Sequence, residues 1–246
     1  MSNIDILINS KTYPAIAQSK PKQAIANFKL SLKSDEFVCL VGPSGCGKTT
    51  LLNIIAGLDK DYDGDIRAEQ QSTYPKMGYV FQNPRLLPWR TVRENIELVL
   101  DNTTSFNDVD NLIYTMQLTS SQHVYPERLS LGMSRRVAII RAFAVDPEML
   151  LMDEPFVSLD APTARQAREL LLKLWQQRPH TVLFVTHDLR EAIALADRIV
   201  FLSASPMRVV SEINVPIARN ERENESLIEA FRLQLKGNYP EINALL

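Results

Sequence analysis

The sequence predicts an α/β fold with a mostly parallel core sheet, and three features of the pattern support this prediction. Short apolar runs bounded by turn residues recur along the chain, as in strands buried on both faces of a parallel sheet. Segments with helical periodicity separate these runs, and a glycine-rich loop directly follows the first of them. The predicted strands are Phe37 to Val41, Met149 to Asp153, Val182 to Thr186 and Ile199 to Leu202.

Helices between the strands are marked by the residues that begin them. Pro162 can occupy the first turn of a helix after Asp160, and the apolar residues that follow lie on one side of it. A second helix begins near Asp188 and runs to Ala196. Two further helical patterns, Val92 to Leu100 and Val109 to Leu118, predict a small helical lobe. The segment from Asn220 to Gly237 has the pattern of an amphipathic helix.

The bulk composition excludes several classes of protein. The apolar runs are far shorter than the ~20 residues that cross a bilayer, so we expect any membrane role to need a partner. Met1 to Lys20 lacks the cationic start and apolar core of a secretory signal, and we expect a cytoplasmic protein. A net charge of -2 gives no broad attraction to nucleic acid. Cys39 and Cys46 fit neither a zinc site nor a disulfide framework.

The glycine-rich loop has the residues of a phosphate-binding loop. GPSGCGKTT satisfies G-x-x-x-x-G-K-[ST] between a strand and the helix predicted for Leu51 to Leu58, a context that disfavours a purely structural turn. Glycines let backbone N–H groups point at phosphate oxygens, and the helix adds its positive N-terminal end. Lys48 supplies charge to the β- and γ-phosphates, and the Thr49 hydroxyl can coordinate Mg²⁺. The predicted nucleotide contacts are Gly42, Pro43, Ser44, Gly45, Cys46, Gly47, Lys48, Thr49 and Thr50.

Two acids follow the buried run Met149 to Met152, at the strand end where open α/β sheets bind ligands. Asp153 would hold Mg²⁺ through water, and Glu154 would polarise the attacking water. A single acid at such a position is often only a helix cap, but a pair in a chain with a complete phosphate loop favours the catalytic role. These two motifs alone also fit kinases, GTPases and helicases.

A third motif separates these families. Ser130 and Gly132 stand at the start of a predicted helix, where a serine and a glycine form a second anion site. Residues Leu129 to Ala142 resemble the signature motif of ABC ATPases, and other patterns of that family follow in its order over nearly the whole sequence. The resemblance implies a P-loop NTPase fold with an N-terminal antiparallel β part beside the core sheet. It also implies a single domain over residues 1 to 246, with a helical lobe at about 85 to 145.

The resemblance assigns roles to single residues as well. It places Gln82 near Mg²⁺ and the attacking water, Asp160 in a segment that crosses a dimer interface, and His187 on the γ-phosphate. Tyr13, in a segment without a regular pattern, would stack on adenine or simply pack. The expectations are catalytic roles for Glu154, His187 and Gln82, nucleotide contacts for Tyr13, Ser130, Gly132 and Asp160, and metal ligation by Thr49, Gln82 and Asp153.

The signature differs from the common family pattern at two positions. Met133 replaces a glutamine, a familiar variant in importer subunits that resemble the nitrate, sulfonate and taurine group. Leu131 replaces the first glycine, and a positive φ there would strain leucine by roughly 1 to 2 kcal/mol. We expect instead that Leu131 is tolerated because its side chain points away from the phosphate.

The implied activity is that of an ATP-hydrolysing subunit of an importer. Two copies would sandwich two ATP-Mg²⁺, each phosphate loop facing Ser130 and Gly132 of the other copy. They would drive separate membrane permease subunits, served by a substrate-binding protein, from the inner face of the cell membrane. Nitrate, sulfonate, taurine and a thiamine precursor stay open as solutes, because other subunits select the solute.

Two other classes are disfavoured. Soluble ABC ATPases of DNA repair carry long coiled coils, and those of translation carry two ATPase domains in tandem, whereas this sequence has neither. A binding module without hydrolysis would not need to retain Lys48, Asp153, Glu154 and His187.

Overall fold

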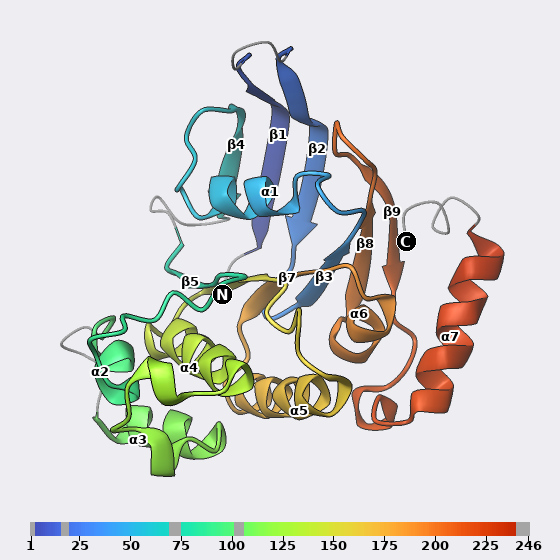
Figure 1. The fold of residues 1–246 in the computed structure, drawn as a ribbon. Helices are drawn as coiled ribbons and strands as arrows, with labels where there is room; N and C mark the ends of the chain where they lie inside the picture. Colours follow the sequence, from blue (N-terminus) through green and yellow to red (C-terminus); the bar gives the residue numbers. More distant parts are fainter. Residues whose placement is uncertain (1–2, 16–19, 69–74, 101–105, 240–246) are drawn as a thin grey trace. The chain divides into compact units, whose positions relative to one another are not determined.

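The computed structural model describes residues 3–15, 20–68, 75–100 and 106–239. It divides into two compact units (Figure 1), the first formed by Met1–Tyr74 with Thr181–Leu246 and the second by the intervening Pro75–His180. The first unit contains the predicted phosphate loop and His187, and the second contains the two acids and the signature motif.

A sheet with buried central strands forms the core of the first unit. β3 (Phe37–Val41) pairs in parallel with β7 (Thr181–Thr186) and β8 (Arg198–Leu202), and β9 (Val209–Asn214) pairs antiparallel with β8. Every residue of β3 and β7 is buried, as expected for continuous apolar strands in a parallel sheet. The three predicted strands of this unit are confirmed, and β9 is an additional one.

The register of β3 and β7 decides where two of the predicted site residues lie. Val41 stands opposite Thr186 in this parallel pair. The residues that come next, Gly42 and His187, therefore leave the sheet at the same edge, which is the carboxyl edge where open α/β sheets bind ligands.

An antiparallel sheet with strand order β2-β1-β4 confirms the predicted N-terminal β part. It contains β1 (Ile4–Tyr13), β2 (Lys22–Leu32) and β4 (Asp63–Ala68). Alternate residues of β1 point into the core, and those of β2 lie opposite them: Ile4 faces Leu32, Ile6 faces Leu30 and Ile8 faces Phe28. The segment from Lys11 to Gln23 was expected to be irregular, but its two ends are regular, because Tyr13 pairs with Lys22 at the end of this ladder after a register shift between Lys11 and Thr12.

One aspartate ties the start of β3 to later parts of the first unit. The Asp197 carboxylate accepts a hydrogen bond from the backbone N–H of Phe37 at 2.9 Å and forms an ion pair with Arg219 at 2.6 Å. The Asp197 backbone donates to the Phe37 carbonyl at 2.7 Å and accepts from Val215 at 2.9 Å. The side chain and the backbone of Asp197 therefore both fix Phe37, the first residue of β3.

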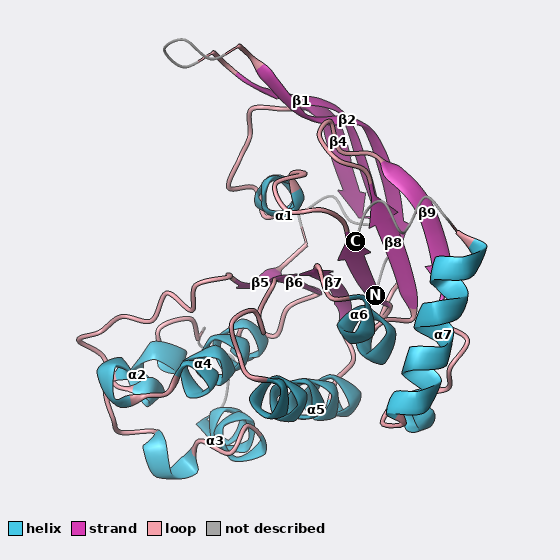
Figure 2. Cartoon of the chain, turned by 45° about the vertical axis from the view of Figure 1, so that its right-hand side comes forward, coloured by secondary structure: helices cyan, strands magenta, loops and turns pink. Residues whose placement is uncertain are grey.

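Two helices close the first unit after these strands. α6 (Leu189–Leu195) begins at its N-cap Asp188, and α7 (Glu225–Asn238) lies beside it (Figure 2). The prediction started the last helix at Asn220, too early, because residues Arg219–Glu221 form a short 3₁₀ turn. The side chain of Asn224 then caps α7 by accepting from Ser226 N at 3.0 Å.

In the described residues of the second unit, two strands pair and four α-helices follow in sequence or lie between them; the helices are labelled in Figure 2. β5 (Met77–Val80) pairs in parallel with the predicted β6 (Met149–Asp153). α2 (Val92–Glu97) is shorter than predicted, whereas α3 (Phe106–Thr115) begins and ends three residues earlier than predicted. Gln117, with φ 56, takes the left-handed conformation that ends a helix. α4 (Leu131–Ala144) and α5 (Ala161–Gln177) follow, the latter with Asp160 as N-cap and Pro162 in its first turn as predicted. Residues 101–105 of the predicted lobe lie outside the described part.

A buried asparagine organises the segment before α2. Asn95 is fully buried, and its amide oxygen accepts a hydrogen bond from Leu87 N at 2.7 Å. Its amide nitrogen donates to the carbonyls of Leu87, Arg90 and Thr91 at 3.1, 3.0 and 2.9 Å. One side chain thus forms hydrogen bonds with four backbone groups of a loop that belongs to no sheet.

We predict that Asn95→Ala lowers the free energy of unfolding by about 1 to 3 kcal/mol, because it removes the amide that bonds the Leu87 N–H and three carbonyls of this partly buried loop. Urea denaturation followed by circular dichroism measures the change. Asn111→Ala, at an exposed position of α3, is the matched control and should change little. Equal stability of the two variants would show that water replaces the Asn95 amide without cost.

Candidate functional site

The phosphate loop is shaped by glycines at two kinds of position. Gly47, the N-cap of α1 (Lys48–Ile55), has φ 116, a left-handed conformation that strains any other residue. Gly42 lies close to β8, since a Cβ placed on it would approach the Leu202 Cβ to 2.9 Å. Gly47 therefore allows the backbone of the loop to turn, and Gly42 allows the loop to pack closely against the sheet.

Lys48 sits inside this loop. The side chain is 5% exposed, and its Nζ donates to the carbonyls of Gly42 at 2.8 Å and Pro43 at 3.0 Å. The loop is thus closed around a positive charge at the N-terminus of α1, where the partial charge of the helix also attracts an anion. Thr49, next in the helix, is exposed.

Tyr13 is joined to the phosphate loop by a hydrogen bond. Its hydroxyl lies 2.9 Å from the Thr50 hydroxyl, and its ring, 39% exposed, lies with the centroid 5.0 Å from Lys11 Nζ. Lys11 is itself buried and pairs with Asp59 at 2.9 Å. An exposed aromatic face held beside a phosphate-type loop can stack on a planar base.

The acids of the second unit stand at the end of β6. Asp153 is 4% exposed, and Glu154, which follows it, has a positive φ of 43. A non-glycine residue in this region costs on the order of 1 kcal/mol, and such residues cluster at functional sites. Burial and then the negative charge of Asp153 raise the pKa of the Tyr79 hydroxyl, which stays neutral beside this carboxylate.

The signature motif forms the start of α4. The Ser130 hydroxyl caps the helix by accepting from Met133 N at 3.2 Å. Leu131 is the first helical residue and is 44% exposed, so the alternative with a strained positive φ is excluded. Gly132 is buried, and a Cβ there would come within 2.6 Å of the Thr163 methyl group on α5. Glycine at this position therefore also serves close packing.

Two arginines of α4 hold backbone carbonyls of distant loops. Arg135, 4% exposed, donates to the carbonyl of Gln82 and, at 3.3 Å, to that of Val157. Arg141 donates to the carbonyls of Pro84 at 2.8 Å and Arg85 at 3.0 Å. Arg135 thus joins the segment that carries Gln82 to the segment that follows Glu154.

Asp160 is used as a helix cap in this structure. Its carboxylate accepts from Thr163 N at 3.0 Å and from the Thr163 hydroxyl at 2.7 Å. These hydrogen bonds, the one to the backbone first, lower the pKa of Asp160. The residue stays exposed at the N-terminus of α5.

Comparison with known proteins identifies the kind of site these features form. Residues 25–157 match the ABC transporter family. The chain belongs to the ABC transporter family. Its relatives include the aliphatic sulfonates import ATP-binding protein SsuB of Bacillus cereus, 44% identical over 83% of this chain and 84% of that protein. The nitrate import ATP-binding protein NrtD of Synechococcus elongatus is 40% identical over 89% of this chain and 83% of that protein.

Solved structures agree with this assignment. The dimeric structure of MJ0796, a bacterial ABC transporter cassette, superposes with a TM-score of 0.74 at 31% identity, over 87% of this chain and all of that one. A post-hydrolysis state of the same cassette, bound to ADP and Pi, gives a TM-score of 0.75. The predicted resemblance to the ABC family and the predicted fold are therefore confirmed.

The structure groups the predicted site residues by unit. The first unit brings Tyr13 and the phosphate loop together and places His187, which is exposed, at the same sheet edge. The second unit holds Gln82, Ser130, Gly132, Asp153, Glu154 and Asp160. Arg135 was not predicted as a contact of the Gln82 segment. Its position offered a signal, because it lies three residues after Gly132 and four before Ile139 on the buried face of the ABC signature helix.

We predict that Leu131→Gly lowers the free energy of unfolding by about 0.5 to 1 kcal/mol, because it adds backbone freedom at the first turn of α4 and relieves no strain. Thermal or urea unfolding, with Leu131→Ala as the control, measures this. A more stable glycine variant would contradict the helical conformation of Leu131.

Arg135→Met should loosen two segments at once, around Gln82 and around Val157, because one guanidinium holds both carbonyls. A hydrogen bond from a charged donor contributes about 1.5 to 3 kcal/mol, which corresponds to roughly tenfold or more in amide exchange. Hydrogen–deuterium exchange with mass spectrometry measures the amide exchange rates of both segments. Arg141→Met is the matched control and should affect residues 84–85 but not Val157. Faster exchange confined to one segment in Arg135→Met would argue against the link.

Proposed function

We propose that the protein is the ATP-hydrolysing subunit of an ABC-type importer and works as a pair of identical chains. The observation that carries the proposal is the phosphate loop, closed around the buried Lys48 ammonium at the start of α1. The names of the SsuB and NrtD relatives support an import role for a small anion such as a sulfonate or nitrate. The ADP and Pi of the MJ0796 cassette support an adenine nucleotide as ligand.

The individual roles follow from the chemistry of the side chains. Residues Gly42 to Thr50 would cradle the phosphates with backbone N–H groups, and Lys48 would neutralise the β- and γ-phosphates. Glu154 would orient and polarise the attacking water, and His187 and Gln82 would complete the contacts to the reacting group. Tyr13 would stack on adenine, since its ring face is exposed and its hydroxyl is held by Thr50.

A magnesium ion would suit the donor types of the three predicted ligands. Thr49, Gln82 and Asp153 offer hydroxyl, amide and carboxylate oxygens, which are the ligands that Mg²⁺ prefers. When bound, Mg²⁺ would supply positive charge that offsets the negative charge of the phosphates. Asp153 would serve the metal, and Glu154, which has a left-handed backbone conformation, would serve the attacking water.

The second copy would contact the start of α4. Ser130 and Leu131 are exposed there, and Asp160 is exposed at the start of α5. Ser130 and Gly132 would face the γ-phosphate held by the other chain, and Asp160 would lie at the contact between chains. The dimeric structure of the MJ0796 cassette supports the pairing of two chains.

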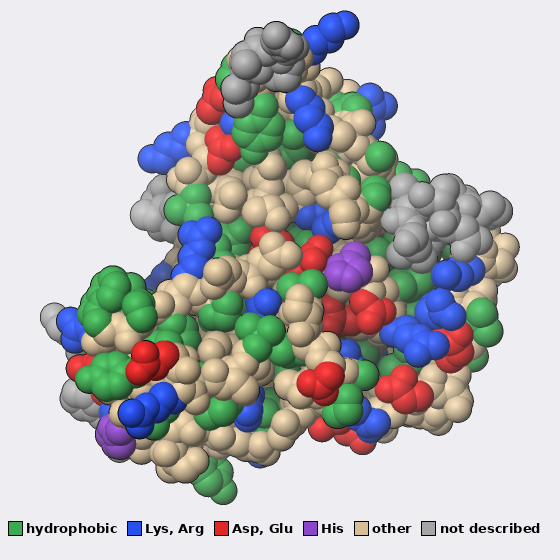
Figure 3. All heavy atoms as spheres, viewed as in Figure 1, with side chains coloured by type: hydrophobic (Ala, Val, Ile, Leu, Met, Phe, Trp, Pro, Cys, Tyr) green, Lys and Arg blue, Asp and Glu red, His purple; other side chains and the backbone are tan. Residues whose placement is uncertain are grey.

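Membrane partners would dock on the second unit. Large apolar side chains gather over α2 at the left of Figure 3. The exposed large apolar side chains of this unit include Trp89, 69% exposed, Leu98, Tyr114 and Tyr125. Aromatic and leucine side chains of this kind suit a helix of a permease subunit. The protein would therefore act at the inner face of the membrane, and a substrate-binding protein would reach it only through the permease. Among the described residues, no helix has the length and apolarity needed to span a bilayer.

We predict that Glu154→Gln retains ATP binding and lowers the turnover number by about 10²- to 10⁴-fold, because an amide cannot accept the proton of the attacking water. Nucleotide binding by fluorescence and phosphate release measure the two effects, and size-exclusion chromatography should show an ATP-dependent dimer. Glu169→Gln, at an exposed position of α5, is the control and should hydrolyse ATP normally. Normal hydrolysis by Glu154→Gln would refute the proposed role of this residue.

A further inference from the structure

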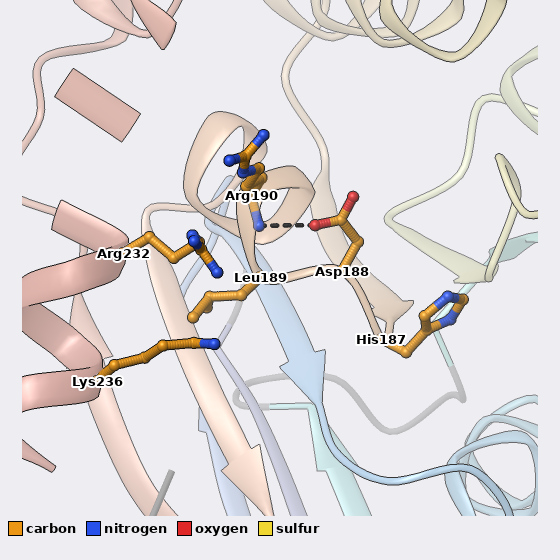
Figure 4. A pocket seen from close by; sticks show the side chains of 6 residues that line it. All are labelled: His187, Asp188, Leu189, Arg190, Arg232 and Lys236. Atoms are coloured by element: carbon orange, nitrogen blue, oxygen red, sulfur yellow. Dashed lines mark hydrogen bonds between the residues drawn. The ribbon is translucent and has the colours of Figure 1, made fainter. Parts of the chain in front are cut away.

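A second cationic site lies in the first unit, beside His187 but outside the phosphate loop. It is a cavity of about 330 Å³ between α6 and α7, which we name the α6–α7 pocket (Figure 4). Its lining residues are His187, Asp188, Leu189, Arg190, Arg232 and Lys236. None of the roles proposed above uses its three basic side chains.

The Asp188 carboxylate lines the pocket, where it attracts Arg232 electrostatically and also caps the start of α6. It accepts from Arg190 N at 2.8 Å and from Glu191 N at 3.4 Å, as the dashed line in Figure 4 indicates for the first of these. Both of these hydrogen bonds use Oδ1, which caps the helix. Three basic side chains therefore meet two carboxylates here, those of Asp188 and Glu229.

Glu229 is shared by two arginines. Its carboxylate lies 2.7 Å from a guanidinium nitrogen of Arg190 and accepts from Arg232 Nη2 and Nε at 2.6 and 2.9 Å. The pairing with the two arginines lowers the pKa of Glu229, with Arg232 as the largest cause, so it stays ionised. One carboxylate thus serves two guanidinium groups, and Lys236, one turn after Arg232 on α7, adds a third cation.

The side chains that gather here have the chemistry of an oxyanion site. Figure 4 shows Arg232 and Lys236 reaching toward Leu189 from α7, with Arg190 above them on α6. Like charges so close repel one another, and a bound anion would relieve that repulsion. A guanidinium has donors on more than one edge, so Arg232 can hold Glu229 and a second acceptor together.

The size of the pocket restricts the ligand. Small-molecule sites span about 300 to 1,000 Å³, so this pocket is at the lower limit and admits a small anion with its water. We propose that the α6–α7 pocket binds a small oxyanion of the phosphate, sulfate or sulfonate type. Since His187 lines the same pocket, the ligand would lie beside the residue that we expect to contact the γ-phosphate.

The test is the binding of inorganic phosphate, measured by calorimetry without ATP, so that it does not depend on the proposed ATPase activity. The Lys48→Ala variant removes the main cation of the phosphate loop and serves as the background. We expect phosphate to bind this variant, and the further pair Arg232→Gln with Lys236→Gln to weaken binding at least tenfold. The pair Arg165→Gln with Lys173→Gln makes the same charge change on α5, including an Arg–Glu pair, and should leave binding unchanged.

Conservative changes keep the test valid if the double variant folds poorly. Arg232→Lys with Lys236→Arg retains both charges and should retain binding, and Lys236→Gln alone should weaken it. Vesicles of phosphatidylcholine with phosphatidylglycerol distinguish the source of the oxyanion. Binding of such vesicles that requires Arg232 and Lys236, without binding of phosphate, would assign the pocket to a lipid headgroup. Loss of all binding in Lys48→Ala, or equal binding by both glutamine pairs, would overturn the proposal.

Discussion

The arrangement of the first unit depends on the burial of one five-residue strand. β3 has no exposed residue and is hydrogen bonded on both sides, to β7 and to β8. Because such a strand cannot shift in register without placing its ladder and its side chains wrongly, its end is held in one place. The phosphate loop begins at that end, and the register with β7 brings His187 to the same edge.

The parts of the fold that the sequence could predict are those with a strong local signal. β3, β6, β7 and β8 are continuous apolar runs, so their positions were predicted within one residue. β9 has only intermediate and exposed residues, and it owes its conformation to pairing with β8 rather than to its own composition. β1 offered a usable signal in the alternation of Ile4, Ile6 and Ile8, which ends where Lys11 turns inward to Asp59. Helix ends depended on single residues, such as Gln117 and the cap Asn224.

The site was predictable to the extent that its chemistry is local in sequence. The phosphate loop and the Asp153–Glu154 pair are contiguous motifs, whereas Arg135 acts on the carbonyl of a residue 53 positions away. Backbone carbonyls are common to all residues, so no sequence pattern marks them as partners. The left-handed conformation of Glu154 could not be predicted from the sequence either, because it results from the turn that follows β6.

The double anchoring by Asp197 has a consequence for how this cassette can diversify. Its carboxylate bonds to Phe37 at the entrance of β3 and to Arg219 beyond β9, while its backbone carbonyl accepts from Val215. Residues 215–219 therefore belong to the scaffold that supports the phosphate loop, although they are remote from it in sequence. Extra regulatory segments can be appended after α7 in evolution without disturbing β3, whereas a deletion that reaches Arg219 would release the strand on which nucleotide binding depends.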